Sequence, residues 1–211
     1  LLQAVSPWNE ETVQRGLHQL VEAEFLYQLG LPPQATYRFK HALIQEEAYQ
    51  SLLRSTRQQY HQRIAQVLEA QFPDTAQTQP EVVAHHYTEA GLNGHAVPYW
   101  QRAGQRASDR SAYVDAIAHL TQGLALLEPL PDTPARAQQE LVVQMTLGPV
   151  LMTLKGGGLP EVERVYTRAR ELCERVGEPA ELFRVLLGMW LMYSLRGEHQ
   201  RTRELGEELL S

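Results

Sequence analysis

The sequence predicts a mainly α-helical protein in which stacked helical hairpins form a solenoid behind a short β-hairpin. Three observations support this prediction. Apolar residues recur at helical spacing through most of the 211-residue chain. Small residues recur at similar places in successive helical segments. Alternation of apolar and polar residues, which is typical of strands, is confined to a short stretch near the N-terminus.

The first predicted helix covers residues 10 to about 28, because its apolar residues recur three and four positions apart. Glycine and two prolines within residues 30–33 then interrupt the helical pattern. The stretches 25–29 and 37–40 alternate apolar and polar side chains. They predict two short strands that form a hairpin, or wing, beside the helices.

Helical periodicity resumes at residue 42 and continues to residue 69, with one break near residue 55. The next segment, 71–80, is polar and flanked by prolines, which predicts a linker. From residue 81 onward we expect only helices and the turns between them. The expected helices span residues 81–91, 95–108, 111–127, 134–154, 160–176, 179–195 and 198 onward.

The helical part of the chain contains three degenerate helical-hairpin repeats. In the first repeat Gly104 precedes Ala116, Leu120 and Gly123. In the second Gly148 precedes Val162, Tyr166 and Ala169, and in the third Gly188 precedes Thr202, Leu205 and Leu209. The recurring order is a glycine followed by a small residue on the next helix. Small residues let two antiparallel helices approach closely, and a bulky residue fills the hole between turns. The period of about 40 residues exceeds the ~34 of a tetratricopeptide unit, so we expect a tetratricopeptide-like solenoid.

Composition and charge exclude several classes of protein. The net charge of −6 argues against a nucleic-acid partner, because no large basic surface is available to neutralise phosphates. The single cysteine, Cys173, rules out an intrachain disulfide framework and suits a reducing compartment. No apolar run reaches the ~18–20 residues that cross a bilayer. We therefore expect a cytoplasmic protein that does not bind membranes.

The motifs that could carry chemistry are incomplete. The stretch "KGGGLP" (155–160) has its lysine before the glycines and no Ser or Thr after them, so a turn is favoured over a phosphate loop. His85, His86 and His95 lack metal-ligand spacing and are expected to pack between helices or to cap them. No nucleophile elbow or catalytic triad can be assembled. We expect no catalytic residues and no metal site.

His41 is the one candidate site residue. It stands in "YRFKHALIQEEAY" (37–49), between a predicted strand and a predicted helix. The N-terminus of a helix favours anions, and the imidazole could donate to a phosphate oxygen. The alternative is that His41 packs the wing against the helix.

Two stretches carry a resemblance to a known family. "YRFKHALIQEEAYQSLLRSTRQQYHQRIAQVLE", followed by "VVAHHYTEAG", resembles the region after the nucleotide-binding core of signal-transduction ATPases with numerous domains, the STAND class. The stretch that starts "GGGLPEVERVYTRARELCERVGEPAELFRVLLGMW" looks like the helical repeats of one bacterial branch. In that branch a class III adenylate/guanylate cyclase or a protein kinase is fused to an AAA-type ATPase and tetratricopeptide-like repeats. The resemblance covers nearly the whole chain.

The resemblance implies a division of the chain and a role for His41. Residues 1–70 would be the winged-helix-like end of an ATPase module, 71–80 a linker, and 81–211 the start of a helical solenoid that is truncated at its C-terminus. His41 matches a winged-helix histidine that contacts the phosphate of bound ADP in the wider class. Ala42 follows it, where that class often has Asp.

The resemblance also implies what lies outside this chain. The Walker A and Walker B segments would lie upstream, so we expect these 211 residues alone neither to hydrolyse ATP nor to make a cyclic nucleotide. ATP or ADP and magnesium are expected in the full-length protein, and no cofactor is expected in this part of it.

The expected function is therefore regulatory. A protein, peptide or small effector on the solenoid would change the nucleotide state of the upstream ATPase core, and through it a cyclase or kinase in the same polypeptide. The alternative from another class is a scaffold whose repeats bind a partner protein with no nucleotide coupling.

Overall fold

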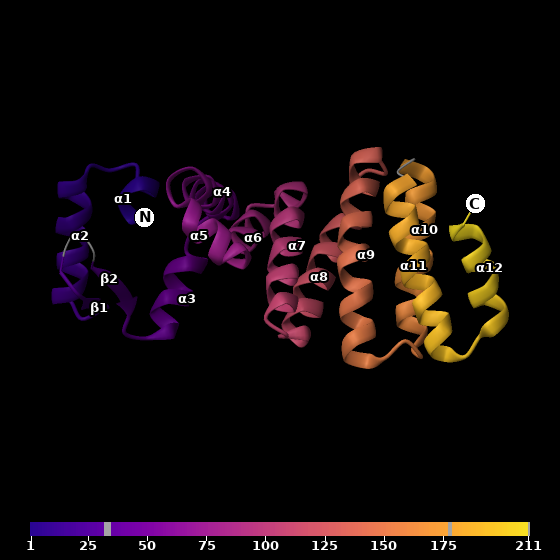
Figure 1. Ribbon diagram of the computed structural model, residues 1–211. Coiled ribbons are helices and arrows are strands. Elements are labelled where there is room, and N and C mark those ends of the chain that lie inside the picture. The colour runs from indigo at the N-terminus through magenta and orange to yellow at the C-terminus, as the bar shows by residue number, and fades with distance from the viewer. Residues whose placement is uncertain (32–34, 177–178, 211) are drawn as a thin grey trace.

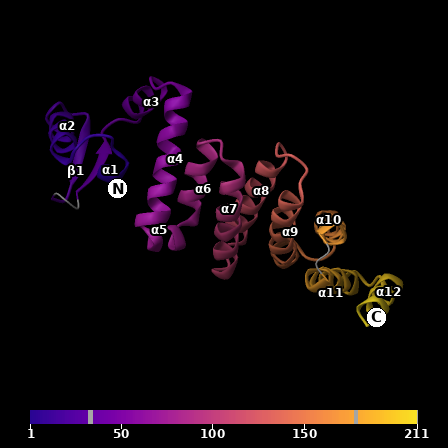
Figure 2. The ribbon, with the colours of Figure 1, turned by 90° about the horizontal axis from the view of Figure 1, so that it is seen from above.

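The computed structural model describes residues 1–31, 35–176 and 179–210. Within these residues the chain is mainly helical, with one two-stranded sheet near the N-terminus (Figure 1). The molecule is elongated, and its helices follow one another from an N-terminal unit at one end to α12 at the other (Figures 1 and 2). This arrangement confirms the predicted fold class.

The N-terminal unit is a helical segment followed by a β-hairpin. Its elements are α1 (Leu2–Val5), α2 (Glu10–Glu22), β1 (Leu26–Leu29) and β2 (Thr36–Phe39). The Asn9 side chain caps α2 by accepting from the Thr12 backbone N–H. The helix ends at Glu22, earlier than predicted, because Glu24 adopts a left-handed backbone (φ 63°) that turns the chain into β1. The strands pair antiparallel, so the predicted hairpin is confirmed.

The N-terminal unit has almost no core of its own. Among the described residues up to Leu53, Leu26 alone is fully buried. The large apolar side chains that remain more than a third exposed in this region are Leu1, Leu2, Trp8, Leu20, Phe25, Tyr27, Leu29, Leu31, Phe39, Leu43, Leu52 and Leu53. An exposed apolar surface of this extent is typical of an interaction site.

Two helices connect this unit to the solenoid. They are α3 (Ala42–Gln50) and α4 (Arg54–Gln71), and the break between them lies close to the predicted one. The segment 71–80, expected to be a linker, is helical over most of its length. It holds α5 (Pro73–Thr78), and α6 (Pro80–Glu89) begins at its end. Each proline occupies the first turn of a helix, where its missing N–H costs nothing.

The rest of the chain forms consecutive helical hairpins. Each helix expected from residue 81 onward is present, with bounds within two residues of the predicted ones. The helices after α6 are α7 (Asn93–Asp109), α8 (Tyr113–Leu127), α9 (Pro134–Lys155), α10 (Pro160–Val176), α11 (Pro179–Arg196) and α12 (His199–Leu209). The "KGGGLP" stretch forms the turn between α9 and α10, as predicted, with Gly156 at φ 81°. No helix in the described residues is long and apolar enough to cross a membrane.

Glycines set the close approaches between helices. A Cβ atom on Gly104 of α7 would lie 2.7 Å from Leu120 Cδ2 of α8, and one on Gly148 of α9 would lie 2.8 Å from Tyr166 Cζ of α10. These two predicted crossings are confirmed. Gly188 of α11 was expected to pack against α12, but a Cβ there would lie 2.6 Å from Tyr166 Cζ instead. The Tyr166 ring therefore fits between two glycines from different helices.

Buried apolar side chains form two clusters along the molecule. The first joins α4, α5, α6 and α7 around Ala65, Leu68, Val83, Tyr87 and Ala96. The second begins on α7 at Val97 and continues through every helix to Leu205 on α12. Leu126 of α8 borders both clusters. Each helix thus packs on its neighbours in the chain, as in a solenoid.

Candidate functional site

His41 lies at the start of α3, directly after β2. It occupies the N-cap position with an extended backbone, its side chain makes no capping hydrogen bond, and it is exposed. The predicted placement at a strand-to-helix junction is confirmed. Its contact with a nucleotide stays a prediction, as does the alternative that it packs the wing.

A hydrogen-bonded chain of three side chains links α3 to the solenoid. Tyr49, near the end of α3, lies with its hydroxyl 3.0 Å from Nε2 of His61 on α4. His61 Nδ1 lies 2.8 Å from Nδ1 of His86 on α6. His61 is buried, with 9% of its surface exposed. The chain joins three helices at the point where the N-terminal unit meets the repeats.

The two histidines are held in the neutral state. The contact between their Nδ1 atoms requires one ring to donate and the other to accept, so the rings cannot both be protonated there. Burial lowers the pKa of His61. The nearby Glu89 carboxylate raises this pKa, whereas the His85 ring lowers it. Burial, together with the neighbouring rings of His61 and His85, lowers the pKa of His86 to about 4. At neutral pH both rings are therefore uncharged.

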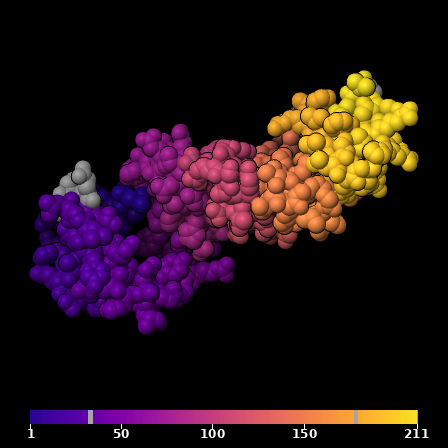
Figure 3. All heavy atoms as spheres, turned by 60° about the horizontal axis from the view of Figure 1, so that its bottom comes forward, coloured from indigo at the N-terminus to yellow at the C-terminus, as the bar shows by residue number. Residues whose placement is uncertain are grey.

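An open pocket of about 640 Å³ lies beside the hydrogen-bonded side chains of Tyr49 and His61. It separates β2 and α3 from α4 and α6, and the molecule is hollowed between the purple lobe and the repeats in Figure 3. The residues that line it are Phe39, Gln45, Glu46, Ala48, Tyr49, Leu52, His61, His85 and Glu89. The Tyr49–His61 bond is thus the polar contact that spans the edge of this hollow.

A second polar cluster joins α4 to the first repeat helices. The Tyr87 hydroxyl of α6 donates to Glu69 Oε2 of α4, and the Tyr99 hydroxyl of α7 donates to Glu69 Oε1 at 2.5 Å. Burial and the hydrogen bond to Glu69 raise the pKa of Tyr99 to about 12 and raise that of Tyr87 further. Both phenols are therefore protonated donors at neutral pH, and one carboxylate holds three helices together.

Of the histidines singled out in the sequence, His86 packs between helices, as expected, whereas His85 and His95 are exposed. His86 contacts His61, and His95 lies with its ring centroid 5.4 Å from that of Tyr87. No group of His, Cys, Asp and Glu side chains in the described parts of the chain could hold a metal ion. Sequence reasoning missed His61. Its spacing of four and seven residues from the buried Ala65 and Leu68 places it on the packed face of α4, which was the available signal.

Comparison with known proteins gives one match. No protein-family model matches the chain. No solved structure matches it. The chain is 30% identical over 209 residues to an uncharacterized protein of Rhizobium meliloti (strain 1021). The match covers 97% of this chain and 20% of that protein, so the chain spans about a fifth of the relative's length. In that relative, the regions that match the N-terminal unit and the repeats lie together within a much longer polypeptide.

Proposed function

We propose that this chain is a regulatory and protein-interaction module of a multidomain signalling ATPase. A partner that binds the solenoid changes the position of α3, and with it the environment of a nucleotide held by the upstream core. The output is carried by a cyclase or kinase elsewhere in the polypeptide. The resemblance to STAND-class ATPases supplies the ATPase and the effector in this proposal.

The observation that carries the proposal is the hydrogen-bonded path from the repeats to α3, the helix that follows His41. His86 of α6 contacts His61 of α4, which contacts Tyr49 of α3, and α3 begins directly after His41. Glu69 fixes α4 to α6 and α7. A shift of the first repeat therefore moves α4, and the tyrosine transmits that movement to α3.

The position of His41 at the N-terminus of α3 supports a contact with an anion. It precedes the unpaired N–H groups of α3, and the first turn of that helix contains no acidic residue to repel a phosphate. Its imidazole can donate to a phosphate oxygen. ATP or ADP with magnesium would be held by the upstream core, and His41 would report the nucleotide state without contributing to hydrolysis. Each ligand must bind one arrangement better than the other for this coupling to work.

The decisive test uses the full-length polypeptide with His41→Ala. We expect the variant to release ADP about tenfold faster than the parent, because a charge-assisted contact to phosphate is lost. Release is measured with a fluorescent ADP analogue, and effector activity is measured in parallel. Unchanged ADP release together with an equally quiet effector would contradict the proposal.

A variant of Tyr49 tests the coupling separately from the nucleotide contact. Tyr49→Phe removes the hydroxyl that reaches His61, so we expect ADP to bind as in the parent while a solenoid partner loses its effect on ADP release. The control is Tyr60→Phe on the neighbouring helix, where the ring is 42% exposed. The control should keep the coupling.

The second candidate is a scaffold without nucleotide coupling. It is favoured by the large apolar cluster from α7 to α12, which contains no residue of the N-terminal unit. In a scaffold, both the His41 and the Tyr49 variants would behave as the parent while partner binding remained intact. The presence of a G-x-x-x-x-G-K-[ST] motif upstream would favour the ATPase instead.

A further inference from the structure

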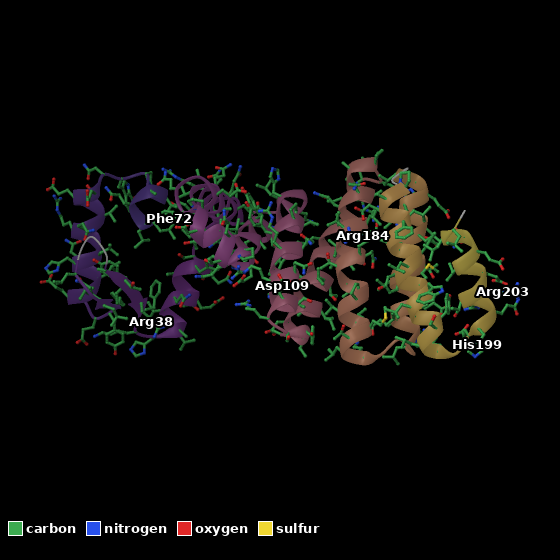
Figure 4. All side chains as sticks on the ribbon, viewed as in Figure 1. Arg38, Phe72, Asp109, Arg184, His199 and Arg203 are labelled. Atoms are coloured by element: carbon green, nitrogen blue, oxygen red, sulfur yellow. The ribbon has the colours of Figure 1, made fainter. Side chains whose placement is uncertain are left out.

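An apolar groove of about 510 Å³ runs between α9 and α11. Figure 4 places Arg184, one of its lining residues, where these two helices run side by side. The groove is lined by Pro149, Met152, Thr153, Tyr166, Arg184, Leu187, Gly188, Leu191 and Leu195. One wall is a row of leucines on α11, four residues apart, and the other is the methionine-bearing face of α9.

Tyr166 forms the floor of this groove with an unused hydroxyl. The side chain is 4% exposed, and no described residue accepts or donates a hydrogen bond at its oxygen. Gly148 and Gly188 both lie against the ring, at positions where a Cβ atom would clash with it. Burial raises the pKa of Tyr166 to about 12, which keeps the hydroxyl protonated and able to donate. The oxygen is not one of the fully buried polar atoms without a partner, so the hydroxyl can donate to a ligand atom or water in the groove.

A second, polar pocket of about 400 Å³ continues the groove toward α7 and shares Pro149 and Arg184 with it. Its polar lining residues include Gln101, Gln105, Ser108, Gln138 and Thr146. The Oε1 atom of Gln138 is buried and has no hydrogen-bond partner. The surface therefore has an apolar half and an amide-rich half side by side, which matches an occupant with one apolar and one polar face.

The groove is not the face on which a further repeat would stack. The groove is lined by α9 and α11, the first helices of two successive hairpins. It therefore opens between two helices of this chain and not at the end of the solenoid. Its leucines nevertheless remain exposed to solvent: Leu187 by 47%, Leu191 by 45% and Leu195 by 64%. Walls that are this open suit a macromolecular partner better than a small molecule, which prefers an enclosed site.

We propose that this groove binds an amphipathic helix of a partner protein. The α11 wall of the groove runs from Arg184 to Leu195, eleven positions further along the helix, so it is about 16 Å long and faces about three helical turns. The partner's apolar residues lie against the leucines and Met152, and its polar flank faces the amide-rich pocket. An acceptor on that helix receives the hydrogen bond of the Tyr166 hydroxyl.

Charge fixes the direction of the bound helix. Of the described residues that line the groove, Arg184 alone is charged, and it forms an exposed ion pair of 3.3 Å with Glu181, which lines the adjoining polar pocket. Such a pair is weak and easily exchanged. The partner helix therefore carries a carboxylate at the end that lies over Arg184. This inference rests on the proposed function only in taking the solenoid as the surface that a partner binds.

The test titrates a labelled synthetic helix of roughly 18 residues into the 211-residue chain. The peptide has leucines on one face at i, i+4, i+7 and i+11, glutamines beside them and glutamate near one end. Its control has the same composition with the leucines scattered around the helix. We expect binding in the range of about 10 µM for the first peptide, measured by fluorescence anisotropy, and at least tenfold weaker binding for the control.

Variants of the chain locate the binding. We expect Leu191→Asp to weaken binding about tenfold or more, and Tyr166→Phe to weaken it about threefold while the ring and the fold are kept. Arg184→Glu should weaken binding of the glutamate peptide but not of a version that carries lysine there. Leu43→Asp, on α3 and 79% exposed, is the matched control and should bind as the parent.

Four outcomes would overturn the proposal. The first two are equal binding of the peptide with scattered leucines and unchanged binding by Leu191→Asp. The third is a dimer of this chain that Leu191→Asp dissociates. The fourth is displacement of the peptide by laurate, a fatty acid, when each ligand occupies the site to the same extent. The titration contains no nucleotide, so its failure leaves the His41 test untouched. Conversely, unchanged ADP release in the His41 variant would leave the groove proposal standing.

Discussion

At Gly104, helices α7 and α8 approach so closely that no side chain fits between them. A Cβ atom there would lie 2.7 Å from Leu120 Cδ2, and Leu120 is completely buried. Real Cβ atoms do not come this close to other carbon atoms, so a methyl group would push the two helices apart. Dense packing transmits such a displacement to the neighbouring helices.

Gly104→Ala is therefore expected to destabilise the chain by about 1–3 kcal/mol, the usual cost of overpacking a core. The measurement is the free energy of unfolding in urea. The control is Gly94→Ala in the same helix, where a Cβ would meet no atom within 4 Å. That change should leave stability unchanged or raise it by up to about 1 kcal/mol, because alanine favours the helix.

The histidine pair predicts a loss of stability in acid. Burial lowers the pKa of His86 to about 4 in the folded chain, while an unfolded histidine titrates near its ordinary value of 6.5. Below that value the unfolded state binds a proton that the folded state refuses. The contribution of the pair is thus fully present above about pH 6.5 and is lost as the pH falls toward 4.

We expect the free energy of unfolding to fall by roughly 1 kcal/mol between pH 7 and pH 4.5 through this pair, since its partial exposure reduces the full effect. His86→Gln should flatten the profile over this interval, because an amide does not titrate. His18→Gln, an exposed residue of α2, should keep the slope of the parent. Equal slopes in both variants would contradict the assignment.

At the scale of elements, a charged contact fixes the α9–α10 hairpin. Arg168 of α10 donates to Glu140 of α9 twice, from Nε at 2.6 Å and from Nη2 at 3.1 Å. Glu140 is 9% exposed, and Arg136 approaches the same carboxylate at 3.9 Å. The hydrogen bonds to Glu140 raise the pKa of Arg168, so the guanidinium keeps its charge.

Glu140→Ala is expected to cost about 2 kcal/mol, because it leaves a partly buried guanidinium without its bidentate partner. Thermal and urea unfolding measure this. Glu207→Ala removes an exposed ion pair with Arg203 on α12 and should cost less than about 0.5 kcal/mol. Similar losses in the two variants would show that Glu140 does not act as a buried partner.

The helices were largely predictable from the sequence, and their contacts were less so. Periodicity placed the solenoid helices well because each buries one apolar face. Segment 71–80 was misread, since proline also starts helices. Gly188 was assigned to the wrong partner because a period in sequence does not say which neighbouring helix faces a residue. His61 pairs with His86 across 25 residues, a contact that only the packed structure shows.

At the scale of the whole molecule, stability is expected to be unevenly distributed. Buried side chains are concentrated in α9, which packs between α8 and α10, and are nearly absent before Leu53. Regions with few buried contacts open more readily than the core. Amide hydrogen exchange should therefore be fastest in residues 1–31 and 35–53 and in α12, and slowest in α9 and α10. Equal protection along the chain would contradict this distribution.

The position of Tyr166 has a mechanical consequence. The ring contacts a glycine on α9 and a glycine on α11, the first helices of two successive hairpins. A ligand that displaces the Tyr166 hydroxyl therefore changes both contacts at once. We therefore expect movements of α9 and α11 to be coupled through this ring. Replacing either glycine by a larger residue would displace the ring and change how far the effect of a bound partner is transmitted along the repeats.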